Sequence, residues 1–194
     1  MPPGPLSGES GRHVRLRRDG ATVSVREELV RLVPPPEGVS LGVDWPALEE
    51  ELGSPLPSDY KWLVERYGPG SFDNFLHVLQ PTSPFPPIRL MSSADRAAEI
   101  LDQLREKEDI PFATEELLPV AKTDNGDTVY WVTRPEDDPD SWTLTGNAAR
   151  NRKWPVFDGG IVAFLAATLS GAHRMEIFPN GFPTESPVFV PLPG

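Results

Sequence analysis

The order of helix and strand signals along these 194 residues predicts an α+β fold. Two stretches with apolar residues at helical spacing come first, a strand-rich middle with strong turn signals follows, and a further helical pattern comes near the end. Helices and strands that are segregated along the chain, rather than alternating, are typical of α+β proteins with an antiparallel sheet. We therefore expect an antiparallel sheet, with a mixed sheet as the alternative, packed against about four helices.

Proline and charge divide the chain into three parts. Residues 1–38 are expected to form a basic N-terminal arm with a short helix and a Pro-rich linker; Ser24 and Glu27 have the spacing of a capping box at the start of that helix. Residues 39–178 carry the signals of the main α+β domain. Residues 179–194 form a Pro-rich C-terminal tail.

The main domain begins with the pattern of a helical hairpin. Asp44 is a suitable N-cap for the first helix, and Gly53 is suited to end it. The second helix follows directly and ends at Gly68. Its apolar face has the i, i+3, i+4, i+7 spacing and consists of Tyr60, Leu63, Val64 and Tyr67.

The strand-rich middle contains one strong hairpin signal. Asn125-Gly126 lies between two apolar runs, and this pair favours positive φ at both central positions of a tight turn. The remaining elements are expected in this order: a strand at 75–79, a helix from about Ser92, hairpin strands at 118–121 and 128–132, strands at 142–145 and 154–157, and a last helix from Gly159 or Gly160 to Gly171.

The overall charge restricts the kind of partner. A net charge of −11 excludes general attraction to a phosphate backbone, which requires a basic face, so we expect no direct nucleic-acid binding. An acidic surface can instead speed encounter with a basic protein, although acidity that merely maintains solubility is the alternative. No run of about 20 apolar residues is present, which predicts no membrane span. With no cysteine and no apolar signal segment, a cytoplasmic protein is the simplest expectation.

The side chains needed for catalysis are scarce. The three histidines, His13, His77 and His173, are far apart and show no metal-ligand spacing, and neither a nucleophile elbow nor a phosphate-binding glycine loop is present. The acidic turn that starts at Asp124 superficially resembles a calcium loop, but its twelfth position is Pro135 instead of glutamate. We expect no enzymatic activity, no metal, no cofactor and no small-molecule substrate.

One cluster of charges stands out as a candidate partner-binding site. Between residues 124 and 140 the chain holds six acidic side chains against the single cation Arg134: Asp124, Asp127, Glu136, Asp137, Asp138 and Asp140. Such a cluster would suit a basic surface, with Trp142 as an aromatic anchor at the centre of the interface. The alternatives are a solvated loop for the charges and a place in the sheet core for Trp142.

The ordered succession of these signals resembles the SUKH superfamily, the Smi/Knr-like group of fungal cell-wall regulators and bacterial immunity proteins. The resemblance covers about residues 40–171. Its first half rests on Trp45, Leu48-Glu49, Leu52-Gly53, Leu56-Pro57, Asp59-Tyr60, Tyr67-Gly68-Pro69-Gly70 and Phe75-Leu76. Its second half rests on Leu118-Pro119-Val120-Ala121, Asn125-Gly126-Asp127, Tyr130-Trp131, Trp142, Phe157-Asp158-Gly159 and Phe164-Leu165.

The resemblance implies a non-catalytic protein that works by binding another protein. Bacterial members bind and neutralise toxins delivered by competitors, often nucleases, which predicts an immunity protein whose partner is a basic toxin domain. The alternative is a regulatory or scaffold module that binds a host protein, as the fungal members suggest. The appended helix at 24–33 and the Pro-rich tail fit this alternative slightly better.

Overall fold

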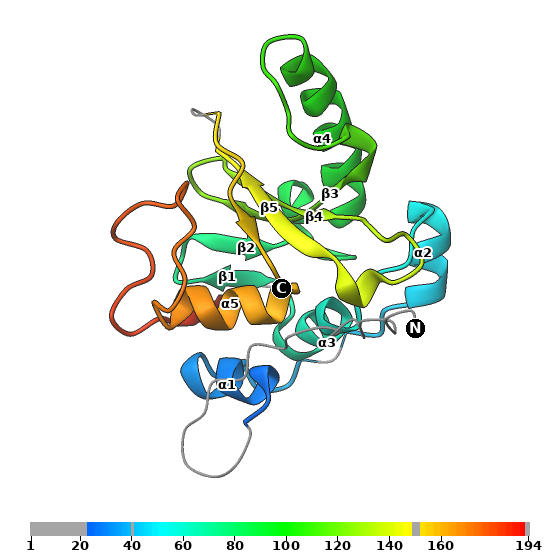
Figure 1. The fold of residues 1–194 in the computed structure, drawn as a ribbon. Coiled ribbons are helices and arrows are strands. Elements are labelled where there is room, and N and C mark those ends of the chain that lie inside the picture. The colour runs from blue at the N-terminus through cyan, green and yellow to red at the C-terminus, as the bar shows by residue number, and fades with distance from the viewer. Residues whose placement is uncertain (1–22, 40, 149–151, 193–194) are drawn as a thin grey trace, which may run out of the picture.

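The computed structural model describes residues 23–39, 41–148 and 152–192, and the predicted basic arm at 1–22 lies outside the described residues (Figure 1). The helices are α1 (Val25–Leu32), α2 (Trp45–Leu52), α3 (Ser58–Tyr67), α4 (Leu90–Arg105) and α5 (Ile161–Leu169), with short 3-10 turns η1 (Pro86–Ile88), η2 (Thr114–Glu116) and η3 (Pro139–Ser141). The strands are β1 (Gly70–Phe72), β2 (Leu76–Val78), β3 (Leu117–Thr123), β4 (Thr128–Val132), β5 (Thr143–Asn147), β6 (Val156–Phe157) and β7 (Phe189–Pro191). The predicted α+β class is confirmed.

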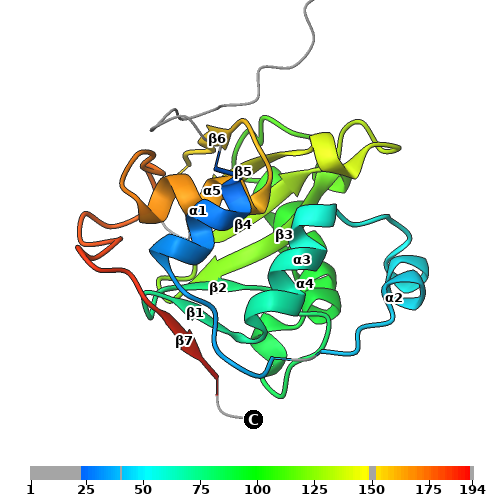
Figure 2. The same cartoon turned by 90° about the horizontal axis from the view of Figure 1, so that it is seen from below.

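The seven strands form one sheet in the order β6-β5-β4-β3-β2-β1-β7. Each strand pairs antiparallel with its neighbour, as expected from the sequence. Helices α3 and α5 cover one face of the sheet, α1 packs against α5 on the outside, and α4 lies across β3 on the opposite face (Figures 1 and 2). The sheet is therefore buried unevenly, with a thick layer on one face and a single helix on the other.

Alternation along β4 divides its side chains between the two faces. Val129 and Trp131 join the large core under α3 and α5, whereas Tyr130 joins the smaller cluster under α4. The ring of Trp131 is fully buried and meets Tyr60 of α3 edge-on, with 5.0 Å between ring centroids. The period-2 pattern of the strand thus builds both apolar layers.

Helix α1 is part of the folded unit. Its predicted capping box is present, with the Glu27 backbone N–H donating to Ser24 Oγ and the Ser24 N–H donating to the Glu27 carboxylate. Leu29 and Val33 are fully buried, and Val33 accepts a hydrogen bond of 2.7 Å from the hydroxyl of Tyr67. The segment predicted as an arm and linker is therefore packed onto the core from α1 onward.

The C-terminal segment also joins the sheet. Strand β7 pairs with β1, and the ring of Phe189 packs against Tyr67 and Phe72 with centroid separations of 5.2 and 5.0 Å. Proline is tolerated here because β7 is an edge strand, where one side makes no ladder bonds. The folded unit thus extends beyond the predicted boundaries 39–178 at both ends.

The β3–β4 hairpin is present, but its turn differs from the expected one. Gly126 has φ 87°, whereas Asn125 is not among the described residues with positive φ. The Thr123 N–H donates to the carbonyl of Asp127, and the Thr123 hydroxyl donates to the Asp127 carboxylate at 2.8 Å. These bonds enclose the three residues 124–126, so the turn is wider than the two-residue turn predicted from Asn-Gly.

A buried carboxylate joins α3 to α5. Asp59 Oδ2 accepts a hydrogen bond of 3.0 Å from the backbone N–H of Val162, in the first turn of α5. Gly160 leaves room for this carboxylate, because a Cβ at that position would collide with Asp59 Oδ2. Burial raises the pKa of Asp59 above its ordinary value, against the opposing effect of hydrogen bonds from the Val162 and Tyr60 backbone.

Candidate binding surfaces

The predicted acidic cluster does not form one surface. Asp124 and Asp127 lie in the turn before β4, whereas Glu136 and the following carboxylates lie in the loop after it. The intervening strand has five residues, which places the two groups roughly 16 Å apart. The two groups of carboxylates are close in the sequence but not in space, because the extended strand β4 runs from one end of the sheet to the other between them.

The two carboxylates of the hairpin turn have different environments. Asp127 is only 4% exposed and stabilises the turn through Thr123, so its side chain is not available to a partner. Asp124 is exposed and lies 2.8 Å from Nε2 of His77 on β2. The prediction of a binding role for Asp127 is contradicted by its burial.

Trp142 is a core residue of the sheet. Its side chain is 1% exposed, and its ring lies against that of Trp131 at a centroid distance of 6.2 Å. The indole N–H donates a 2.7 Å hydrogen bond to the carbonyl of Pro135, which satisfies its only polar atom. The structure thus contradicts the predicted interface anchor and supports the alternative stated with it.

Asp140 has a structural partner at the start of α3. Its Oδ1 accepts a 2.6 Å hydrogen bond from the Ser58 N–H, which Pro57 at the N-cap position does not satisfy with a side chain. The bond supplies the cap from a distant segment and holds the β4–β5 loop beside the connection between α2 and α3 (Figure 2).

The remaining three acidic residues of this loop form an exposed patch, which we call the acidic loop (residues 136–138). Glu136 pairs with Arg134, which also contacts Glu116 at 2.7 Å. Asp137 and Asp138 make no ion pair with any described residue. They are the part of the predicted site that combines exposure with unbalanced negative charge, and a basic surface would meet them without displacing a structural contact.

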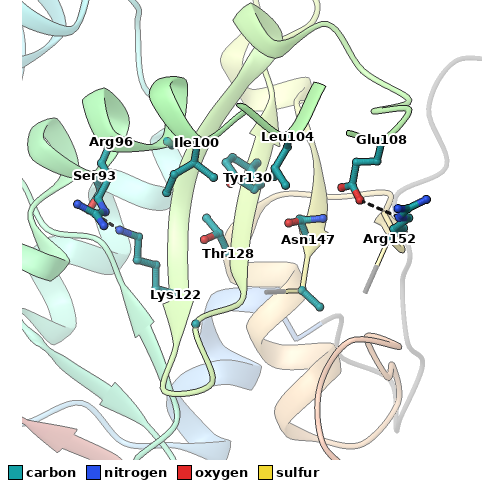
Figure 3. Close-up of a pocket in the computed structure, with 13 residues that line it drawn as sticks. Ser93, Arg96, Ile100, Leu104, Glu108, Lys122, Thr128, Tyr130, Asn147 and Arg152 are labelled. Atoms are coloured by element: carbon teal, nitrogen blue, oxygen red, sulfur yellow. Dashed lines mark hydrogen bonds and ion pairs between the residues drawn. The ribbon is translucent and has the colours of Figure 1, made fainter. Parts of the chain in front are cut away.

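A second surface, missed by the sequence predictions, lies on the α4 face of the sheet. A cavity of about 430 Å³ lies between α4 and strands β3 to β5, and we call it the α4 groove (Figure 3). Its floor includes Lys122, Thr128 and Asn147, which are directly opposite one another on three neighbouring strands. Its helical wall is largely apolar and includes Ala97, Ile100 and Leu104.

The polar groups of the α4 groove are mainly hydrogen-bond donors. Lys122 Nζ donates to Ser93 Oγ at 3.1 Å, and its pKa is lowered by burial and, to a smaller extent, by the positive charge of Arg96. Asn147 is 8% exposed, and its Nδ2 has no hydrogen-bond partner in the described structure. At the far end of the groove, Arg152 Nε lies 3.5 Å from Glu108 Oε2, and this ion pair balances the positive charge of Arg152.

The polar residues that form the floor of this groove are visible in the sequence, but the sequence does not indicate that they lie together. Lys122, Thr128 and Asn147 are polar residues at the ends of strands, a common feature. Their alignment depends on the register between β3, β4 and β5, which includes an irregularity between Pro119 and Ala121. A shift of one residue would have moved these side chains to the opposite face.

The histidines occupy unrelated positions. His77 forms a hydrogen bond with Asp124, whereas the ring of His173 packs edge-on against Phe157 and Phe164, and burial lowers the pKa of His173. Across the described residues, no group of three or more side chains suited to a metal ion was found. No described helix is both long and apolar enough to cross a membrane.

An antiparallel sheet with helices on both faces, and surfaces formed by loops and a groove, define an α+β protein of the SUKH class, whose members generally act through protein–protein interaction. The chain belongs to the SMI1 / KNR4 family (SUKH-1), whose model matches residues 43–161, more than half of its length. Comparison with curated proteins and with solved structures gave no match. Family membership fits a role as an immunity protein or as a regulator.

Proposed function

We propose that this protein is a cytoplasmic immunity protein that binds and neutralises a cognate toxin without catalysis. Family membership and the acidic character of the chain support this proposal. The observation that carries it is the acidic loop, where Asp137 and Asp138 are exposed, make no ion pair with a described residue, and are followed by Asp140 and Trp142, which are anchored to α3 and to the core. A basic toxin domain, such as one that binds nucleic acid, has the complementary charge.

The base of the acidic loop explains why its charges can act together. Asp140 ties the loop to α3, and Trp142 fixes the following strand in the core. Because these contacts restrain the loop before a partner arrives, little conformational entropy is lost on binding. The exposed charges then chiefly increase the association rate, which depends on ionic strength.

A regulatory or scaffold role was the alternative suggested by the appended N-terminal helix. The apolar face of that helix, including Leu29 and Val33, is buried against the rest of the molecule. This helix therefore stabilises the fold of the chain itself. Its presence does not favour a scaffold role over the neutralisation of a toxin.

The experiment starts from the intact protein as bait in an extract of its own cells, with captured proteins identified by mass spectrometry. Each captured protein is then produced in a test bacterium with and without this chain. The proposal expects one captured protein to arrest growth alone and to be harmless in the presence of this chain. If none of the specifically captured proteins is toxic, the immunity role is refuted.

The role of the acidic loop is tested with the same pair of proteins. The triple variant Glu136→Lys, Asp137→Lys, Asp138→Lys should lower the association rate by about tenfold or more at low salt and flatten its salt dependence. A matched control with the same change in net charge uses exposed positions on α4 and at its C-cap, namely Glu99→Lys, Asp102→Lys and Glu106→Lys. Equal effects of the two variants would mean that net charge alone, and not the acidic loop, guides the encounter.

A further inference from the structure

We propose that the α4 groove binds an extended acidic peptide segment of a protein partner. This inference goes beyond the proposed function, because it assigns a second surface of opposite charge on the other face of the sheet. It does not depend on whether the partner is a toxin. The argument rests on the donors in the groove, on its length and on the charge of the segments available to fill it.

The floor of the groove has the chemistry of a carboxylate site. Lys122 and the neighbouring Arg96 supply two positive charges, and neither forms an ion pair with a described residue (Figure 3). Asn147 adds a buried amide donor that has no partner. A buried donor without an acceptor is unfavourable, so a ligand that brings acceptor oxygens removes an existing penalty. A carboxylate is such a ligand, and its charge also balances the two cations.

The position of these donors is unusual for a sheet covered by a helix. Side chains that face a packed helix are normally apolar, as Tyr130 and Leu117 are in the neighbouring part of the same interface. Lys122, Thr128 and Asn147 form a polar row across three strands instead. Departures from an otherwise consistent apolar pattern are expected where function requires them.

The dimensions of the groove favour a peptide over a compact anion. Its lining runs along α4 from Ser93 to Leu104, roughly 16 Å at 1.5 Å per residue, and continues beyond the end of the helix to Glu108. An extended peptide of about six residues has this length. Ile100, which is 41% exposed, and Leu104 offer apolar contacts beyond the reach of a single carboxylate or phosphate. A carboxylate at Lys122 with an aliphatic side chain against Ile100 would use both parts of the groove.

The occupant is more consistent with a partner than with this chain. The N-terminal arm contains Arg12, Arg15, Arg17 and Arg18, so its charge has the same sign as that of Arg96 and Lys122. The acidic loop is tied to the start of α3, which lies on the opposite face of the sheet. An acidic segment from a second protein remains complementary in charge.

The test selects peptides on the full-length protein from a displayed library of random hexapeptides. We expect enrichment of sequences in which Asp or Glu is followed within a few residues by Leu, Ile or Val. The most enriched peptide is then labelled with fluorescein, and its affinity is measured by fluorescence anisotropy. Lys122→Gln and Asn147→Ala should each weaken binding by about tenfold, the usual effect of losing a hydrogen bond to a charged group.

Two further variants separate a binding defect from a folding defect. Arg96→Gln changes an exposed side chain and should weaken binding without lowering the unfolding temperature. Lys107→Gln removes one positive charge from an exposed position beyond the end of α4 and should leave the affinity within about twofold of wild type.

Several results would overturn the proposal. The first is a peptide selection that shows no enrichment of Asp or Glu. The second is a peptide affinity that neither Lys122→Gln nor Arg96→Gln changes. The third is binding of acetate or inorganic phosphate as tight as that of the peptide, which would indicate a small-anion site. Loss of peptide binding in the acidic-loop triple variant would place the peptide on the other surface. None of these results bears on toxin neutralisation, so the two proposals can fail separately.

Discussion

The contribution of the C-terminal strand to the fold is tested by Phe189→Ala. The ring of Phe189 lies between Tyr67 and Phe72 at the edge of the sheet, and a residue outside the predicted domain therefore completes an aromatic cluster of the core. If the tail were an independent appendage, removing this ring would leave the stability of the domain unchanged.

The magnitude follows from the burial and contacts of the ring. Truncating a fully buried Phe to Ala typically destabilises a protein by about 3–5 kcal/mol. Phe189 is half-buried, which lowers the expected loss, while its two edge-on ring contacts contribute about 0.5–1.5 kcal/mol each. We expect a loss of about 2–3 kcal/mol in the free energy of unfolding, which lowers Tm by roughly 5–10 °C for a chain of this size.

The assay is urea denaturation of the full-length protein, followed by tryptophan fluorescence and far-UV circular dichroism. Val190→Ala is the matched control, because Val190 lies on the same strand but is 36% exposed, and it should cost about 0.5 kcal/mol or less. Equal midpoints for Phe189→Ala and Val190→Ala would refute the argument that the tail belongs to the core.

A second variant tests the same contact from the opposite strand. A Cβ at Gly70 would collide with the Phe189 ring and lie 2.6 Å from the carbonyl oxygen of Val190. Gly70→Ala should therefore displace β7 and destabilise the protein at least as much as Phe189→Ala does. Because both changes affect one contact, the double variant should lose less stability than the sum of the two losses.

Three further outcomes are expected. The folded-state pKa of Asp59 is raised, so the stabilising contribution of Asp59 is complete below the unfolded-state pKa near 3.9 and falls as the pH rises through the folded-state pKa. The free energy of unfolding of wild type relative to Asp59→Asn, measured by urea denaturation, should therefore decrease between pH 4 and pH 7. A difference that stays constant over this range would contradict the raised pKa. Asp140→Ala removes the acceptor for the Ser58 N–H and should lower the free energy of unfolding by about 1 kcal/mol, whereas Asp138→Ala should change it little in the same measurement. Trp142→Ala should lose about 3–5 kcal/mol and shift the unfolding midpoint far below that of wild type, and a near-normal midpoint would show that the ring is not part of the core.

Local patterns predicted most of the elements, because their causes are local. The capping box at Ser24, the N-cap at Asp44 and the left-handed Gly53 each depend on residues within one turn of a helix. The apolar face of α3 could be predicted for the same reason, since helical periodicity alone places Tyr60 and Tyr67 on one side.

The candidate sites were predictable only in part. The six carboxylates were visible in the sequence as a run of negative charge. In the structure, strand β4 separates them into two groups, the side chains of Asp127 and Asp140 accept structural hydrogen bonds, and Trp142 is buried in the core. Which of these charges remain free depends on partners far along the chain, such as Ser58 for Asp140, and no local pattern indicates such a pairing.

By itself the sequence determined the class of fold, the helices and their ends, the main hairpin and the acidic character of the molecule. Only the tertiary structure decided that α1 and β7 join the core, that Asp137 and Asp138 are exposed without an ion pair to any described residue, and that Lys122, Thr128 and Asn147 align beneath α4. The physical reason is range: caps, periodicity and turns are set by neighbours a few residues apart, whereas burial and strand register are set by contacts between segments that meet only when the whole chain has folded.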